Sequence, residues 1–219
     1  MNKTLEQLEQ KIGRRIAHNE QLGSHTVLKE NTICEYFLEV ERVDDLVKAV
    51  LAAKEVGIPF AVIGSGSYLS LPDETILGLV IKNNSRKFDK MSISGRIQDR
   101  ELGVSEILVQ AESGTPMNQL VRFTIEEGLS GLEYQLGMPG TVGGALYTNA
   151  KYKKHYVKDA LQAVRVLTSE GKVEIHMQDI DKHLDDGILL SAIFRLVPED
   201  KKVLWERGHE ALEFRNTRH

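Results

Sequence analysis

The segment Ile58–Leu71, "IPFAVIGSGSYLSL", leads from an apolar run into Gly64, Ser65, Gly66 and Ser67. Glycines allow successive backbone N–H groups to converge on an anion, and serine hydroxyls can donate to phosphate oxygens. A plain tight turn uses the same residue types, and glycine-rich turns are common. Taken alone, this stretch therefore favours a plain turn over a phosphate site.

The turn does not fit a Rossmann nucleotide fingerprint. That motif needs Gly-x-Gly-x-x-Gly between a strand and a helix. Gly64 and Gly66 fit, but the third position is Leu69, and the residues that follow contain Pro72 and lead into another strand. A Rossmann site is excluded on both counts.

A second cluster, "GMPGTVGGA", places Gly137, Gly140, Gly143 and Gly144 in one segment, with Thr141 as a hydroxyl donor. Small residues there let a flat or anionic ligand approach the main chain closely. A crowded crossing between core elements would explain any one of these glycines. Two such clusters in one chain favour a dinucleotide site.

Periodicity and turn residues predict the elements that carry these clusters. Helices are expected at residues 5–16, 43–57, 115–128 and 199–219, strands at 33–40, 59–64, 78–83, 107–113 and 188–198, and a hairpin at 160–177 around "SEGK". The chain is therefore expected to be α+β, with two parts divided near residue 84.

Several details of the predicted helices are open to test. Leu46, Val47, Val50 and Leu51 are expected to form one apolar stripe, and Gly57 to end that helix. In the next helix Thr115 is the expected N-cap, Pro116 the first helical residue and Gly128 the end. Gly208 is expected to interrupt or weaken the last helix.

Composition narrows the class of protein. The 219 residues carry a formal net charge of -4, which gives no basic field for nucleic acid. The single cysteine, Cys34, excludes an intrachain disulfide and a cysteine-based zinc site, and fits a reducing compartment. The charged start is no signal peptide, no apolar run is long enough to span a bilayer, and the histidines lack metal-ligand spacing. The cytoplasm is the expected location.

Beyond the two clusters, longer stretches of the sequence show a recognisable pattern. They are "EYFLEVERVDDLVKAVLAAKEVGIPFAVIGSGSYLSL", "GLVIKNNSR", "EEGLSGLEYQLGMPGTVGGALYTNA", "VKDALQAVRVLTSEGKV" and "AIFRLVPEDKK". In these stretches the sequence resembles the UDP-N-acetylenolpyruvoylglucosamine reductase family. These stretches cover most of the chain in collinear order. The resemblance is therefore far more specific than either glycine cluster.

The resemblance implies an α+β FAD-binding domain of the p-cresol methylhydroxylase type, with mixed sheets, flanking helices and FAD held between two subdomains, here residues 1–84 and 85–219. It also implies NADPH as the reductant of an enolpyruvyl sugar nucleotide in peptidoglycan synthesis. By motif, the residues expected to bind the cofactor are Gly64, Ser65, Gly66, Ser67, Tyr68, Gly114, Pro139, Gly140, Thr141, Val142, Gly143, Gly144 and Ala145.

The chain departs from the family pattern at several points. Tyr68 stands where the family has Asn, Asn31 and Thr32 replace a glycine pair, and "KYKKHYVKD" replaces a small glycine-bearing loop. The Tyr-Arg-x-Ser segment that supplies the family's catalytic arginine does not fit before the last strand. The family's third domain, with its proton-donating serine, would begin about where the sequence ends. We therefore assign no catalytic residue and expect the chain not to be a competent reductase alone.

Two alternatives remain open. One is a scaffold or binding protein that kept the fold and lost FAD, and the other is an oxidoreductase acting on a different substrate. An apolar surface at the position of the third domain would favour self-association or a partner chain.

For the remaining candidate residues we expect solvated or structural roles and no part in catalysis. His25 is expected to be a solvated loop residue, Glu126 and Glu133 to be solvated charges, and Cys34 to be an inert buried thiol. Trp205, on the last helix, is expected to pack against the body or the surface left by the third domain.

Overall fold

The computed structural model describes residues 3–26, 32–67, 74–98, 101–177 and 180–217. Within these ranges, the side chains of residues 92–104 are not described. The chain divides into two compact units, Met1–Ser85 and Arg86–His219. Each unit combines a sheet with helices, so the predicted α+β class is confirmed.

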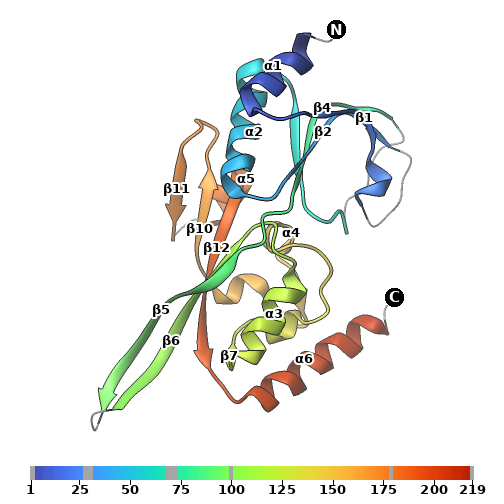
Figure 1. Ribbon diagram of the computed structural model, residues 1–219. Coiled ribbons are helices and arrows are strands. Elements are labelled where there is room, and N and C mark those ends of the chain that lie inside the picture. The colour runs from blue at the N-terminus through green and yellow to red at the C-terminus, as the bar shows by residue number, and fades with distance from the viewer. Residues whose placement is uncertain (1–2, 27–31, 68–73, 99–100, 178–179, 218–219) are drawn as a thin grey trace. The chain divides into compact units, whose positions relative to one another are not determined.

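Unit 1 is built on a four-stranded sheet in the order β1-β2-β4-β3 (Figure 1). The strands β2 and β3 both run parallel to β4, whereas β1 is antiparallel to β2. The bounds are α1 (Lys3–Ile12), β1 (Ala17–Gln21), a 3-10 turn η1 (Leu22–Ser24), β2 (Ile33–Val40), α2 (Val43–Val56), β3 (Phe60–Ile63) and β4 (Ile76–Asn83).

The helix α2 shows how local signals fix an element of unit 1. Acidic residues occupy its first turn, where the helix dipole favours them, and Gly57 closes it in the left-handed conformation with φ 77°. Its buried face includes Leu46 and Val50, as predicted. Leu51 is 37% exposed, however, so the predicted stripe was wrong at that position. The buried face continues instead through small residues such as Ala49.

Unit 2 is built on a six-stranded sheet in which β11, β10, β12, β6 and β5 follow one another and β7 pairs with β12 (Figure 1). The strands that form it are β5 (Phe88–Gln98), β6 (Glu101–Glu112), β7 (Leu129–Ser130), β10 (Leu161–Leu167), β11 (Val173–His176) and β12 (Ile188–Pro198). Each neighbouring pair is antiparallel. The predicted hairpin around "SEGK" is β10–β11 and is confirmed.

Helices and short segments complete unit 2. They are α3 (Met117–Glu126), η2 (Glu133–Gln135), α4 (Val142–Tyr147), β8 (Lys151–Tyr152), β9 (His155–Tyr156), η3 (Val157–Ala160), α5 (Ile180–Asp186) and α6 (Lys201–Asn216). A single apolar core joins side chains of α3, α4 and α6 to the sheet, including Leu120, Leu146, Leu204 and Phe194, all with 0% exposure.

The structure corrects two predicted helix details in unit 2. The N-cap of α3 is Pro116, without a side-chain cap, and the Thr115 hydroxyl instead donates to the Lys87 carbonyl at 3.5 Å. The helix α6 runs through Gly208 without interruption. A Cβ at that glycine would lie 3.0 Å from Leu136 Cδ2, so the residue permits close packing of α6. Within the described residues, no helix is long and apolar enough to cross a membrane.

Candidate functional site

The turn after β3, residues Gly64–Ser67, is called the unit 1 turn below. Its two hydroxyls, Ser65 Oγ and Ser67 Oγ, lie 2.8 Å apart in a hydrogen bond. Gly66 has φ 69°, and a Cβ there would come within 2.7 Å of Thr26 Cβ and Cγ2. The glycine is therefore required by backbone conformation and by contact with Thr26. Tyr68 lies outside the described residues.

The Thr26 side chain ends in a buried hydroxyl without a partner. Among the described residues, no group forms a hydrogen bond with Thr26 Oγ1. Most buried polar groups in proteins are hydrogen-bonded, and an unpaired one lowers stability. This hydroxyl belongs to the residue that packs directly against Gly66. The unit 1 turn is thus bordered by a buried hydroxyl that no described residue satisfies.

His25 holds the chain beside Thr26. Its Nε2 lies 2.9 Å from Glu20 Oε1, its Nδ1 lies 3.6 Å from Glu39 Oε1, and its ring stacks at 4.1 Å on Phe37. Its backbone N–H also donates to the Leu22 carbonyl at 2.8 Å. The side chain is only 19% exposed, so the expectation of a solvated loop histidine was wrong. Sequence reasoning could not see the two carboxylates that fix it.

The second glycine segment, residues 137–145, is called the unit 2 loop. Backbone hydrogen bonds tie it to the segment before α3: Val142 N–H donates to Thr115 O at 2.8 Å, and Met117 N–H donates to Gly140 O at 3.0 Å. The Thr141 hydroxyl caps α4 by accepting from Gly144 N–H at 3.3 Å. The loop is therefore held in one shape by its own backbone and by its cap.

Gly143 and Gly144, adjacent in this loop, have different surroundings. A Cβ on Gly143 would lie 3.0 Å from the Ser113 carbonyl oxygen, to which Gly143 N–H donates at 2.8 Å. Packing alone explains that glycine. Gly144 is exposed, and a Cβ there would meet only Thr141 Oγ1 at an ordinary 3.7 Å. Glycine in a helix is less stable than alanine by about 1 kcal/mol. No contact among the described residues requires a glycine at position 144.

The other residues expected at the cofactor lie around this loop. Val142 and Ala145 are buried in the core of unit 2, so only their main chain could face a ligand. Gly114 is buried beside Thr115, and Pro139 is exposed.

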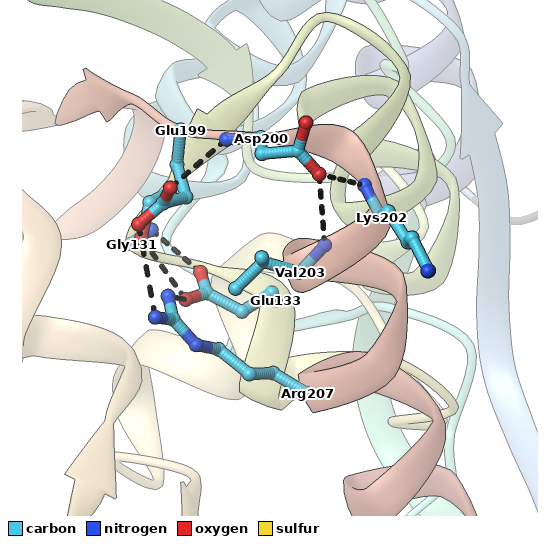
Figure 2. A network of polar contacts seen from close by, with 8 residues as sticks. Gly131, Glu133, Glu199, Asp200, Lys202, Val203 and Arg207 are labelled. Carbon is cyan, nitrogen blue, oxygen red and sulfur yellow. Dashed lines mark hydrogen bonds and ion pairs between the residues drawn. The ribbon is translucent and has the colours of Figure 1, made fainter.

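Glu133 was expected to be solvated, and that expectation was wrong. Only 2% of this residue is exposed. As Figure 2 shows, its carboxylate accepts from Gly131 N–H at 2.6 Å and from Arg207 Nη1 at 3.3 Å. Ser130 Oγ also donates to it, at 3.0 Å. Glu126, in contrast, is exposed as expected.

The contacts of Glu133 connect α6 to the segment that leads into the unit 2 loop. In the same region, Arg215 donates to the carbonyls of Leu136 at 2.7 Å and Tyr134 at 2.9 Å. Arg207 also lies 3.7 Å from Glu199, next to Asp200, whose side chain caps α6 (Figure 2). The helix α6 therefore holds the segment that leads directly into the unit 2 loop.

Two further side chains behave as buried structural residues. Cys34 has 0% exposure, its Sγ donates to the Glu20 carbonyl at 3.6 Å, and burial raises the pKa of its thiol to about 11. The expected burial of this thiol is confirmed. Trp205 packs against the core of unit 2, with the Arg122 guanidinium 5.9 Å from its ring. Among the described residues, no three His, Cys, Asp or Glu side chains are placed to hold a metal ion.

Comparison with known proteins identifies the class to which this geometry belongs. The family model of the FAD binding domain matches residues 34–175, which include the unit 1 turn, the unit 2 loop and well over half of the chain. The chain belongs to this family of FAD binding domains, and FAD is the cofactor that the family binds.

Within that class, the chain is similar to curated UDP-N-acetylenolpyruvoylglucosamine reductases. It is 28% identical to that of Syntrophus aciditrophicus (strain SB), with 98% of this chain and 68% of the relative covered. It is 32% identical to that of Anoxybacillus flavithermus (strain DSM 21510 / WK1), with 80% and 54% covered. The chain thus spans between about half and two thirds of the length of these relatives.

Solved structures agree on the fold. The UDP-N-acetylenolpyruvylglucosamine reductase from Thermus caldophilus superposes with a TM-score of 0.68 at 24% identity, covering 92% of this chain and 70% of that one. A VAO-type flavoprotein from Myceliophthora thermophila C1 superposes with a TM-score of 0.64 at 11% identity, covering 90% and 47%. The predicted FAD-binding fold with two α+β parts is confirmed.

Proposed function

We propose that this chain is the FAD-holding part of a flavoprotein reductase, and that the unit 1 turn and the unit 2 loop both take part in binding FAD. The observation that carries the proposal is Gly144, an exposed helical glycine that the packing of unit 2 does not require. A ligand that approaches the main chain closely supplies the missing reason. The family match across both glycine segments supports the same assignment.

The residues proposed to contact the cofactor are those expected from the sequence. Gly64, Ser65, Gly66 and Ser67 would surround the phosphates with backbone N–H groups and hydroxyls, and Tyr68 would adjoin them. The main chain of Gly114 and of residues 139–145 would approach the flavin and phosphates. Units 1 and 2 would then serve as the two FAD-binding subdomains.

The reaction is proposed from the named relatives. FAD supplies hydride chemistry when bound, and the relatives are reductases of an enolpyruvyl sugar nucleotide by name. We propose NADPH as the reductant and peptidoglycan precursor synthesis in the cytoplasm as the setting. We assign none of the described residues as the proton donor for the substrate. The role of these residues is to bind and orient the cofactor.

A second candidate is a scaffold that kept the fold without the cofactor. The observation that favours it is that packing alone explains Gly66 and Gly143, so these two glycines would persist without FAD. Under this alternative Gly144 has no function, and FAD does not change the stability of the protein.

The test is an absorbance spectrum of the purified protein before and after incubation with FAD and desalting. Retained flavin bands, together with a melting temperature that rises with FAD concentration, are expected if the folded protein binds FAD. A colourless protein whose melting temperature ignores excess FAD would overturn the proposal in favour of the scaffold. Anaerobic NADPH added to the FAD-loaded protein then tests the reductant, because bleaching of the flavin band reports hydride transfer without the sugar nucleotide.

A further inference from the structure

We propose that Thr26, which no sequence motif singled out, is a further ligand of FAD, and that its hydroxyl donates to a pyrophosphate oxygen. This inference rests on the proposed function, because it assumes that the unit 1 turn binds the FAD phosphates. It adds a residue from a different part of unit 1 to the proposed site. Three observations carry it.

The first is position. Thr26 lies against the unit 1 turn so closely that a Cβ on Gly66 would be 2.7 Å from its Cβ and Cγ2 and 3.1 Å from its Cα. No residue larger than glycine fits at position 66 without moving Thr26. The threonine and the turn therefore form one packed unit, with the Ser65 and Ser67 hydroxyls on the same turn.

The second is the unsatisfied hydroxyl. Thr26 Oγ1 is buried and has no hydrogen-bond partner among the described residues. A valine would fill nearly the same volume without an unpaired polar atom, so the hydroxyl lowers the stability of the ligand-free protein. A group that destabilises the ligand-free fold at a binding turn is expected to gain its partner from the ligand.

The third is preorganisation. His25, the preceding residue, is fixed by two carboxylates, by a ring contact with Phe37 and by a backbone hydrogen bond to Leu22. The backbone at Thr26 therefore starts from a fixed point, and this residue has little freedom left to lose when a ligand binds. Thr26 packs on a turn that carries two serine hydroxyls, and a phosphate oxygen accepts several hydrogen bonds, so it could take one more from the Thr26 hydroxyl.

The chemistry of a phosphate oxygen is shared by the pyrophosphate of FAD and the single phosphate of FMN. We assign the hydroxyl to the pyrophosphate. ADP carries a pyrophosphate without the flavin, so its competition with FAD should depend on Thr26.

The experiment compares Thr26→Val, which removes the hydroxyl, with Thr26→Ser, which keeps it. Two quantities are measured for each purified protein: the melting temperature without FAD, and the dissociation constant, for FAD from the change in flavin fluorescence and for ADP by competition with FAD. For Thr26→Val we expect an unchanged or higher melting temperature and FAD binding weakened about tenfold or more, as for loss of one hydrogen bond to a charged group. Thr26→Ser should bind FAD within a few-fold of the wild type.

The two quantities separate the possible failures. If the wild type binds FAD and Thr26→Val binds it equally well, this inference is overturned and the proposed function stands. If Thr26→Val melts lower than the wild type without FAD, the hydroxyl has a structural partner and the inference falls whether or not FAD binds. Weaker binding of FAD with unchanged competition by ADP would overturn the assignment to the pyrophosphate. A wild type that binds no FAD overturns the proposed function and this inference together.

Discussion

The two glycine-rich segments of this protein are held in different ways. The unit 2 loop is tied by backbone hydrogen bonds to the segment before α3, capped by Thr141 and supported by α6. The unit 1 turn has a hydrogen bond between its two serines and a close contact with Thr26, whose own hydroxyl has no partner in the described part of the chain. Contacts within the protein fix the shape of the unit 2 loop, whereas we propose that the hydroxyl beside the unit 1 turn finds its partner in the ligand.

The glycines within one cluster are therefore present for different reasons. In the unit 2 loop, Gly143 is required by the Ser113 carbonyl, and its neighbour Gly144 is required by nothing in the described protein. In the unit 1 turn, Gly66 is required by packing, and the sign of a ligand is the hydroxyl beside it. Surroundings, rather than residue type, separate structural from functional glycines.

The largest expected loss of stability comes from removing the contacts between Glu133 and its neighbours, which hold the segment before the unit 2 loop. Glu133→Ala would delete the acceptor of three hydrogen bonds and leave Arg207 without its buried partner, which costs about 3 kcal/mol of unfolding free energy. Urea unfolding of the variant and the wild type measures this loss.

Glu126→Ala is the matched control, because Glu126 is an exposed carboxylate on α3. It should change stability by less than about 0.5 kcal/mol. Equal effects of the two substitutions would contradict the support that we assign to α6 and Glu133.

The next largest effect is expected at Gly143. An alanine there would bring a Cβ to 3.0 Å from the Ser113 carbonyl, which the loop cannot easily move because Gly143 N–H is bonded to it. We expect a loss of about 1–3 kcal/mol, the usual range for overpacking, together with weaker FAD binding. Thermal unfolding without FAD measures the loss of stability. A Gly143→Ala variant as stable as the wild type would show that the loop is not rigid.

Cys34 gives a pH-dependent effect in unit 1. Burial raises its pKa from 9.0 to about 11 in the folded state. The unfolded thiol therefore ionises first as pH rises, so its contribution to stability is complete below pH 9 and is lost towards pH 11. By pH 10 the loss is about 1 kcal/mol.

The measurement for Cys34 is the difference between the stability curves of the wild type and Cys34→Ala from pH 8 to 11, in which the other titrating groups cancel. The difference should shrink or reverse as pH rises. A difference that stays constant with pH would show that the folded thiol is not buried from solvent as the structure describes.

The smallest change in stability is expected for Gly144→Ala. Its direction is informative, because we expect this substitution to raise stability. Its Cβ meets open space apart from Thr141 Oγ1, and alanine favours the helix by about 0.5–1 kcal/mol. The FAD-free protein should therefore melt higher than the wild type, while its affinity for FAD falls. Higher stability with unchanged FAD affinity would remove the functional reason that we assign to Gly144.

Much of the fold could be predicted because local signals agree with tertiary packing. The helix α2 has acidic residues at its start, an apolar face and Gly57 at its end, and the hairpin β10–β11 has a short polar turn. The strand β5 was missed because "FDKMSISGRIQ" mixes polar and apolar residues without a clear alternation. The helix α4 was missed because it has six residues, two of them glycines.

The features that define the candidate site depend on contacts distant in sequence. The partner of Glu133 is Arg207, and Gly66 packs on Thr26. No periodicity or motif records such pairs, so the sequence could not distinguish a buried carboxylate from a solvated one. The glycine clusters could be recognised from the sequence, but the reason for each glycine depends on the residues that surround it in the structure.

The central claim, that the two glycine segments bind FAD, is tested most directly by titrating the flavin-free wild-type protein with FAD and with FMN and following flavin fluorescence. We predict saturable binding of one FAD per chain, with FMN, which lacks the pyrophosphate, bound at least about tenfold more weakly. Absence of saturable FAD binding, or equal affinity for FAD and FMN, would contradict it.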